Sequence, residues 1–139
     1  MSWKTTFWLV GLWGLTAQGV CVNGHPSIAS EFQHSEAVVL ATVIGIKQLP
    51  ETQDGNFLDG IMYQVKVQRR FKGSNPPTLD VFSENSSGRF EMTAGEAYLL
   101  FLYEDHGRLS VDNCGHSGVA SKSTSAIEQI TKMAHPKNL

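Results

Sequence analysis

The chain has 139 residues, of which 41% are hydrophobic, with two cysteines and a formal net charge of −2 at neutral pH. This length fits one domain, and the nearly balanced charge argues against a surface built to bind a polyanion. The N-terminal region carries a single basic residue, Lys4, followed by an apolar stretch at 7–15 and small or polar residues at 16–19.

A basic start, a short apolar core and a small-residue exit characterise a secretory signal peptide. The apolar stretch is shorter than the about 20 residues that a membrane-spanning helix needs. Residues 1–19 are therefore predicted to be removed by cleavage before Val20. Cleavage after Ala17 is one alternative, and a buried N-terminal helix is another reading of the segment. Loss of Lys4 changes the net charge from −2 to −3. Residues 20–139 are expected to form a single extracytoplasmic domain, secreted or periplasmic, without a membrane span.

The two cysteines, Cys21 and Cys114, lie near opposite ends of this mature chain. An even number of cysteines in an oxidising compartment favours a disulfide. Two separate thiols, or a link between two chains, are the alternatives. A bridge between them would close a long loop and remove about 4–5 kcal/mol of unfolded-chain entropy.

Five stretches have the composition of β-strands. Residues 37–46 and 97–103 are apolar almost throughout, which is typical of strands buried on both faces. Residues 62–71 alternate with period two, and residues 78–82 form a shorter run. Residues 108–111 follow a turn at 104–107, so the sequence predicts that they form a hairpin with 97–103.

Two short helices are expected beside the strands. Pro26 suits a first helical position, before a helix at 27–32. Ser125 and Glu128 match a capping box at the start of a helix over about 125–134. Residues 50–60 are polar and loop-like. This set of elements predicts a mainly β protein, a five-stranded OB-type barrel with one or two flanking helices. A β-sandwich, which usually needs about seven strands, is the alternative.

The sequence lacks the residue patterns that most enzymes and metal sites require. No phosphate-binding loop or nucleophile elbow is present, and none of the histidines has zinc-ligand spacing with a second histidine or cysteine. The histidines are His25, His34, His106, His116 and His135. We therefore expect a protein that is not an enzyme and has no cofactor or intrinsic metal.

Two further patterns have a functional and a simpler reading. The basic stretch at 66–72 could bind single-stranded nucleic acid, as OB folds often do. The export signal and acidic charge balance favour a solvated strand face instead, so no nucleic-acid partner is expected. Asn85-Ser86-Ser87 is a glycosylation sequon, which matters if the source is a eukaryote.

An ordered set of motifs resembles the N-terminal domain of tissue inhibitors of metalloproteinases and the wider netrin-like family. The motifs are Cys-Val-Asn-Gly-His-Pro at 21–26, Ala-Val-Val-Leu-Ala at 37–41, Tyr-x-Val at 63–65 leading to Phe-Lys-Gly at 71–73, Gly-Glu-Ala-Tyr-Leu-Leu at 95–100, and Gly-Arg-Leu at 107–109 leading to Cys114. They cover nearly the whole mature chain. The resemblance implies a netrin-like barrel that keeps the Cys21–Cys114 bridge. The small single domain with few cysteines looks most similar to bacterial members of the family.

The same resemblance implies a mode of binding. In these inhibitors, the free α-amino group and carbonyl of the first residue bind the zinc of the protease, held by a Cys-x-Cys start. Here Gly19 and the pair Ser87-Gly88 stand where the first cysteine and its partner would be, so that bridge is absent. A third bridge and the second domain of the animal inhibitors are absent too. Carried over, the inhibitory ridge would consist of Val20, Cys21, Val22, Asn23, Ser86, Ser87 and Gly88, with Val20 contacting the zinc of the protease.

The sequence thus favours an exported protein-binding domain, and inhibition of a zinc metalloproteinase is the most specific hypothesis. The alternative is a binding or structural module of the cell envelope with a different partner. An enzyme would need a pocket with convergent titratable groups, which the sequence does not display.

Overall fold

The structure is a computed structural model that describes residues 21, 24–50, 59–74 and 76–136. The predicted signal peptide at 1–19, and Val20, Val22 and Asn23 of the expected ridge, lie outside these residues. The elements in chain order are α1 (Ile28–His34), β1 (Ala37–Gln48), β2 (Gly60–Lys72), β3 (Thr78–Glu84), β4 (Ala97–Asp105), β5 (Arg108–Ser110), β6 (Gly118–Val119), the 3₁₀ helix η1 (Ala120–Lys122) and α2 (Thr124–Ala134).

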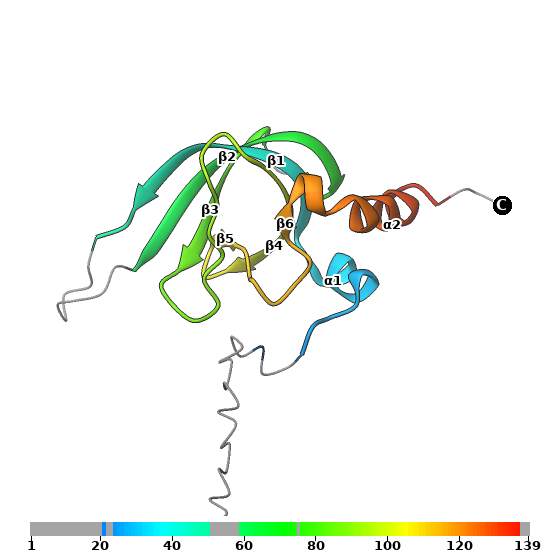
Figure 1. The fold of residues 1–139 in the computed structure, drawn as a ribbon, viewed down its shortest axis with the longest axis horizontal. Helices are drawn as coiled ribbons and strands as arrows, with labels where there is room; N and C mark the ends of the chain where they lie inside the picture. The colour runs from blue at the N-terminus through cyan, green and yellow to red at the C-terminus, as the bar shows by residue number, and fades with distance from the viewer. Residues whose placement is uncertain (1–20, 22–23, 51–58, 75, 137–139) are drawn as a thin grey trace, which may run out of the picture.

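The first five strands close into a barrel. Antiparallel pairing joins β1 to β2, β2 to β3, β5 to β4 and β4 back to β1, while β3 and β5 pair in parallel. This ring confirms the predicted five-stranded OB-type barrel over the β-sandwich. The short strand β6 pairs with β4 outside the ring. Figure 1 shows the strands curving around the barrel with α1 and α2 on one side of it.

The two continuous apolar runs are explained by burial on both faces. In β1, Val39 and Ala41 point into the barrel core, whereas Val38 packs in a second core under the helices. In β4, Leu100 faces the barrel interior and Phe101 faces the helices. Beyond the part of β1 that pairs with β4, the strand leaves this cover, and its two isoleucines Ile44 and Ile46 are exposed.

The other predicted strands also match their patterns. Tyr63 and Val65 of β2 are buried while the residues between and after them are exposed, as period two requires. The β4–β5 hairpin turns at His106 and Gly107, which both have positive φ, as a two-residue type I′ turn needs. Gly107 meets this requirement without strain.

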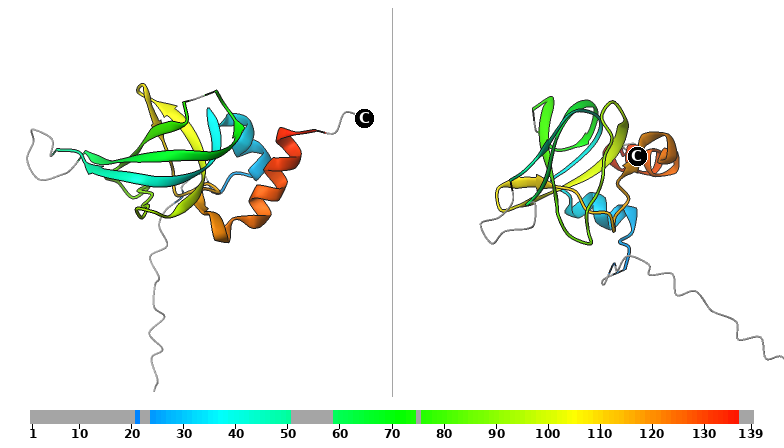
Figure 2. Two further views of the ribbon diagram at one scale, coloured as in Figure 1. Left: turned by 90° about the horizontal axis from the view of Figure 1, so that it is seen from above. Right: turned by 60° about the vertical axis from the view of Figure 1, so that its left-hand side comes forward.

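The two helices cover one outer face of the barrel (Figure 2). Ser27 caps α1 by accepting a hydrogen bond from the Ser30 amide. In α2, Ala126 and Ile130 are buried against the outer side of the sheet. The capping box expected at Ser125 is not formed, because α2 begins one residue earlier, at Thr124. No helix among the described residues is long and apolar enough to cross a membrane.

Candidate functional site

A disulfide joins the start of the described chain to the loop after β5. Cys21 and Cys114 are bonded, with their Cα atoms 5.6 Å apart, which confirms the predicted pairing within one chain. The His25 Nδ1 donates to the Cys114 carbonyl at 2.8 Å, and the Gly24 amide donates to the Cys21 carbonyl at 2.9 Å. The disulfide and the His25 bond therefore fix Cys21 and His25 against this loop.

A buried carboxylate of α1 also holds the loop that carries Cys114. Glu31 of α1 is only 2% exposed, and its Oε2 accepts from the His116 amide at 2.8 Å and from His116 Nδ1 at 2.7 Å. Gly115 lies directly against this carboxylate, so close that a Cβ there would overlap Glu31 Oε1. The buried charge therefore has the partners it needs, and it docks the loop onto α1.

Tyr103 of β4 lies beside the same buried carboxylate. Its burial raises the pKa of its phenol to about 12, and the negative charges of Glu31 and Asp112 act in the same direction, against a smaller opposing effect of a hydrogen bond with Ser35. Tyr103 is therefore a neutral hydroxyl over the whole physiological pH range, and it adds no charge to its surroundings.

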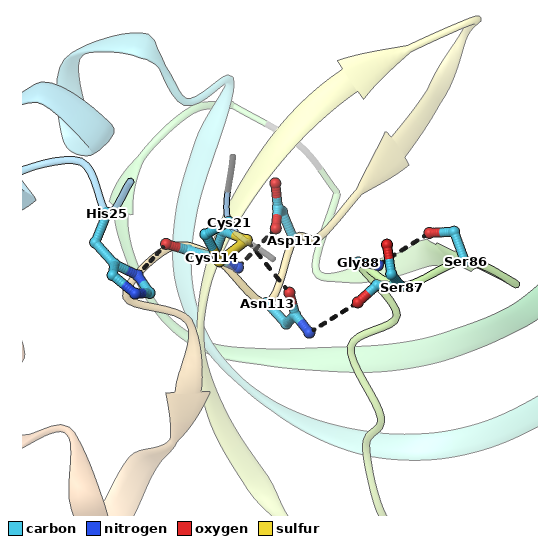
Figure 3. The surroundings of a disulfide bond; sticks show 8 residues. All are labelled: Cys21, His25, Ser86, Ser87, Gly88, Asp112, Asn113 and Cys114. Carbon is cyan, nitrogen blue, oxygen red and sulfur yellow. Dashed lines mark hydrogen bonds between the residues drawn. A yellow bond between two sulfur atoms is a disulfide. The ribbon is translucent and has the colours of Figure 1, made fainter. Parts of the chain in front are cut away.

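The β3–β4 connection approaches the disulfide from the other side (Figure 3). Asn113 Nδ2 donates to the Ser87 carbonyl at 3.4 Å, which links the two loops. Within the connection, Ser86 Oγ donates to Glu84 Oε1 at 3.0 Å and accepts from the Gly88 amide at 3.1 Å. These bonds give the exposed turn a defined shape beside Cys114.

An open hollow of about 620 Å³ lies between these segments. Cys21, Ser86, Ser87 and Gly88 all line it, so the described members of the expected ridge surround one depression. We call these four residues the disulfide edge. A smaller hollow of about 240 Å³ adjoins the first and shares Tyr103 in its wall.

Among the described residues, the charged ones that line the two hollows are acidic. Glu84 and Asp112 line both of them, and Asp105 lines the smaller one. Asp112 also accepts from the Cys114 amide at 2.6 Å, which ties this carboxylate to the disulfide loop. Acidic side chains therefore lie beside the disulfide edge.

Sequence reasoning located the disulfide but missed Glu31, Tyr103 and Asp112. No local signal marks them, because Glu31 meets His116 only when residues 85 positions apart are brought together. His116 was considered only as one of five histidines without zinc-ligand spacing, and its side chain bonds to the Glu31 carboxylate. Within the described parts of the chain, no group of three or more side chains is arranged to hold a metal ion.

The basic stretch on β2 has partners inside the protein. Lys72 Nζ donates to the carbonyls of Phe32 and Gln33 at the end of α1, at 2.9 and 2.8 Å. Arg69 lies over the Phe71 ring at 4.7 Å. These contacts give Lys72 and Arg69 structural roles, and the expectation that nucleic acid is not a partner remains a prediction.

Comparison with models of known protein families gave no match, and neither did comparison with curated proteins. The disulfide fits a protein that folds in an oxidising, extracytoplasmic compartment.

Proposed function

We propose that this protein is an exported, non-enzymatic protein-binding domain that uses the disulfide edge to bind its partner. The observation that carries this proposal is the position of Cys21, which the disulfide fixes beside Ser86, Ser87 and Gly88 at the rim of one open hollow. A partner can contact the N-terminal segment and the β3–β4 connection at the same time.

The fixed geometry of the edge favours binding. The disulfide, the His25 bond to Cys114 and the Asn113 bond to Ser87 all restrain it before a partner arrives. Less ordering entropy is then lost when the complex forms. The docking of the Cys114 loop on Glu31 extends this restraint into the body of the protein.

The specific form of the proposal is inhibition of a zinc metalloproteinase, which rests on the resemblance described above. A terminus just ahead of Cys21 would present an α-amino group and a carbonyl to the zinc of the protease and displace its bound water. Only the amine without its extra proton can donate to a metal, and its ordinary pKa of about 7.7–8 leaves a usable neutral fraction near pH 7.

An inhibition titration tests this form of the proposal. Protein that begins at Val20 is titrated against a panel of zinc metalloproteinases, alongside a sample whose N-terminal amine is acetylated. We expect stoichiometric loss of protease activity with the first sample and none with the second. A Ser87→Arg variant should weaken inhibition, whereas Ser125→Arg, at an exposed position on α2, should not.

The titration also distinguishes metalloproteinase inhibition from binding to a different partner. If micromolar protein inhibits no protease in the panel, the metalloproteinase hypothesis is wrong. The disulfide edge would then serve another partner, as in a binding or structural module of the cell envelope.

A further inference from the structure

One end of β1 has an open edge. β1 pairs with β2 as far as Gln48, but its pairing with β4 ends at Thr42, and Val43 makes the last backbone bonds on that side. Among the described residues, no strand lies beside residues 44–48 on the side away from β2. Figure 2 shows this end of β1 projecting from the barrel next to β2. An unpaired strand edge is a template for another strand.

This open edge also carries exposed apolar side chains. Ile44 is 51% exposed and Ile46 is 47% exposed, and they are the large hydrophobic side chains that the described part of the chain leaves exposed. We propose that the open edge binds the same edge of a second copy, so that two molecules pair in antiparallel fashion through residues 44–48 about a two-fold axis. The inference is independent of the proposed function, because none of these residues lines the hollow at the disulfide edge.

The backbone of the open edge presents its hydrogen-bonding groups at alternate residues. The Leu49 amide donates to the Gly60 carbonyl at 3.0 Å, toward β2. The register with β2 is regular from there back to the bulge near the middle of β1. The amide and carbonyl of Lys47 therefore also face β2, whereas those of Ile46 and Gln48 face the open side. A second strand can bond to these outward groups without breaking any bond between β1 and β2.

Charge selects the register of the pairing. A register that places Ile46 beside Gln48 of the second copy puts Lys47 directly opposite Lys47 of that copy. Like charges directly opposite each other destabilise a sheet. Centring the pairing on Ile46 removes this conflict, because Lys47 then lies opposite Gly45, and Ile46 lies opposite Ile46 of the second copy. The two-fold axis therefore passes between the two Ile46 residues, which bury each other's apolar surface.

Gly45 leaves room for the incoming lysine. A Cβ at this position would be 3.8 Å from Gln64 Oε1, so this amide oxygen lies beside the glycine. Gly45, Gln64 and Asp80 line one surface hollow of about 420 Å³. A lysine of the second copy can extend over Gly45 into this hollow, where Gln64 offers an acceptor and Asp80 the opposite charge. Lys47 of the same chain lines the hollow too, and in the pair it would turn toward Gly45 of the second copy.

Concentration-dependent association tests the pairing. Sedimentation equilibrium of the oxidised protein covers about 10 µM to 1 mM, because a contact through one short strand is smaller than a stable interface and should be weak. We expect the average mass to rise toward twice that of one chain. Hydrogen exchange measured by NMR at both ends of this range should show protection that grows with concentration at the Ile46 amide. The Lys47 amide, which faces β2, should not change.

Two sets of variants assign the association to this edge. Ile46→Pro removes an N–H that faces away from β2, where an edge strand tolerates proline, and should abolish the association. Ile46→Val keeps the N–H and is the matched control. Gly45→Glu should tighten the dimer at least about twofold through two ion pairs with Lys47 of the second copy, and Gly45→Lys should weaken it by a similar factor. A Cβ at Gly45 makes only ordinary contacts, so both variants should fold.

Three results would overturn the inference. The first is a mass that stays at one chain up to about 1 mM, and the open edge would then be free for a strand of a different protein. The second is association that Ile46→Pro leaves unchanged, because another surface would be responsible. If circular dichroism shows that Ile46→Pro does not fold, the two Gly45 variants decide. Equal effects of Gly45→Glu and Gly45→Lys are the third result, since they contradict the proposed register.

Discussion

Replacing Gly115 with alanine tests how the disulfide loop is held. The three atoms nearest to a Cβ at this position all belong to the Glu31 carboxyl group. The added Cβ would overlap the nearest of them, Oε1. Glu31 must therefore move, and its bonds from the His116 amide and ring would be lost or stretched. Charge-assisted hydrogen bonds contribute about 1.5–3 kcal/mol each, and disrupting a buried charged pair costs about 3–5 kcal/mol. We expect Gly115→Ala to destabilise the protein by about 2–4 kcal/mol.

Urea unfolding of the oxidised proteins measures this effect, and two comparisons assign its cause. Gly88→Ala is the matched control, because a Cβ there is 3.5 Å from Ser86 Oγ, an ordinary contact, and should change stability by less than about 0.5 kcal/mol. In a Glu31→Ala background, Gly115→Ala should cost less than about 0.5 kcal/mol, since the clashing group is gone. Full additivity of the two substitutions would refute the reasoning.

Two further predictions concern the same region. Replacing Cys21 and Cys114 by serine removes a bridge with a sequence separation of 93 and should lower the free energy of unfolding by about 4 kcal/mol. Urea unfolding with and without reductant measures this loss, and an unchanged unfolding midpoint would contradict the expectation. The pKa of Tyr103 is raised from 10.0 to about 12 in the folded protein. Between these values the folded state keeps a proton that the unfolded chain has lost, so stability should fall as pH rises, by no more than about 2 kcal/mol for this partly exposed group. Tyr103→Phe should remove that part of the alkaline loss, and equal pH slopes for both proteins would count against it.

Local patterns in the sequence predicted much of the barrel. Strand composition located the five barrel strands because burial on one or both faces dictates either period two or a continuous apolar run. The strand at 37–46 was predicted correctly, but the expected burial on both faces was wrong at its end. Ile44 and Ile46 are exposed, because they lie past the part of β1 that β4 covers. The parallel contact between β3 and β5 has no local signature, although it closes the ring.

Helix ends were less predictable from spacing alone. The Ser125 and Glu128 pattern matched a capping box, yet α2 starts at Thr124 after η1. Ser123 occupies the cap position, and its hydroxyl donates to the Val119 carbonyl instead of capping an amide. A side chain that can bond back to the preceding turn competes with the capping role.

Only the disulfide of the candidate site was predictable from the sequence, because the two cysteines identify it directly. Two cysteines in a chain that is expected to be exported predict a bridge, and Cys21 and Cys114 form it. The contact of Glu31 with His116 forms only when two segments far apart in the sequence meet. The residues around each of them give no local pattern that predicts this contact. The acidic lining of the hollow likewise arises from Glu84 and Asp112, which belong to different loops.

The proposed function depends on one premise, that export leaves a chain that begins at Val20 with Cys21 bonded to Cys114. Intact-mass analysis of the exported protein, before and after reduction, measures this directly. We expect the mass of residues 20–139 lacking the two thiol hydrogens, and a gain of these two hydrogens on reduction. A mass that retains residues 1–19, a terminus several residues from Cys21, or free thiols before reduction would contradict the account.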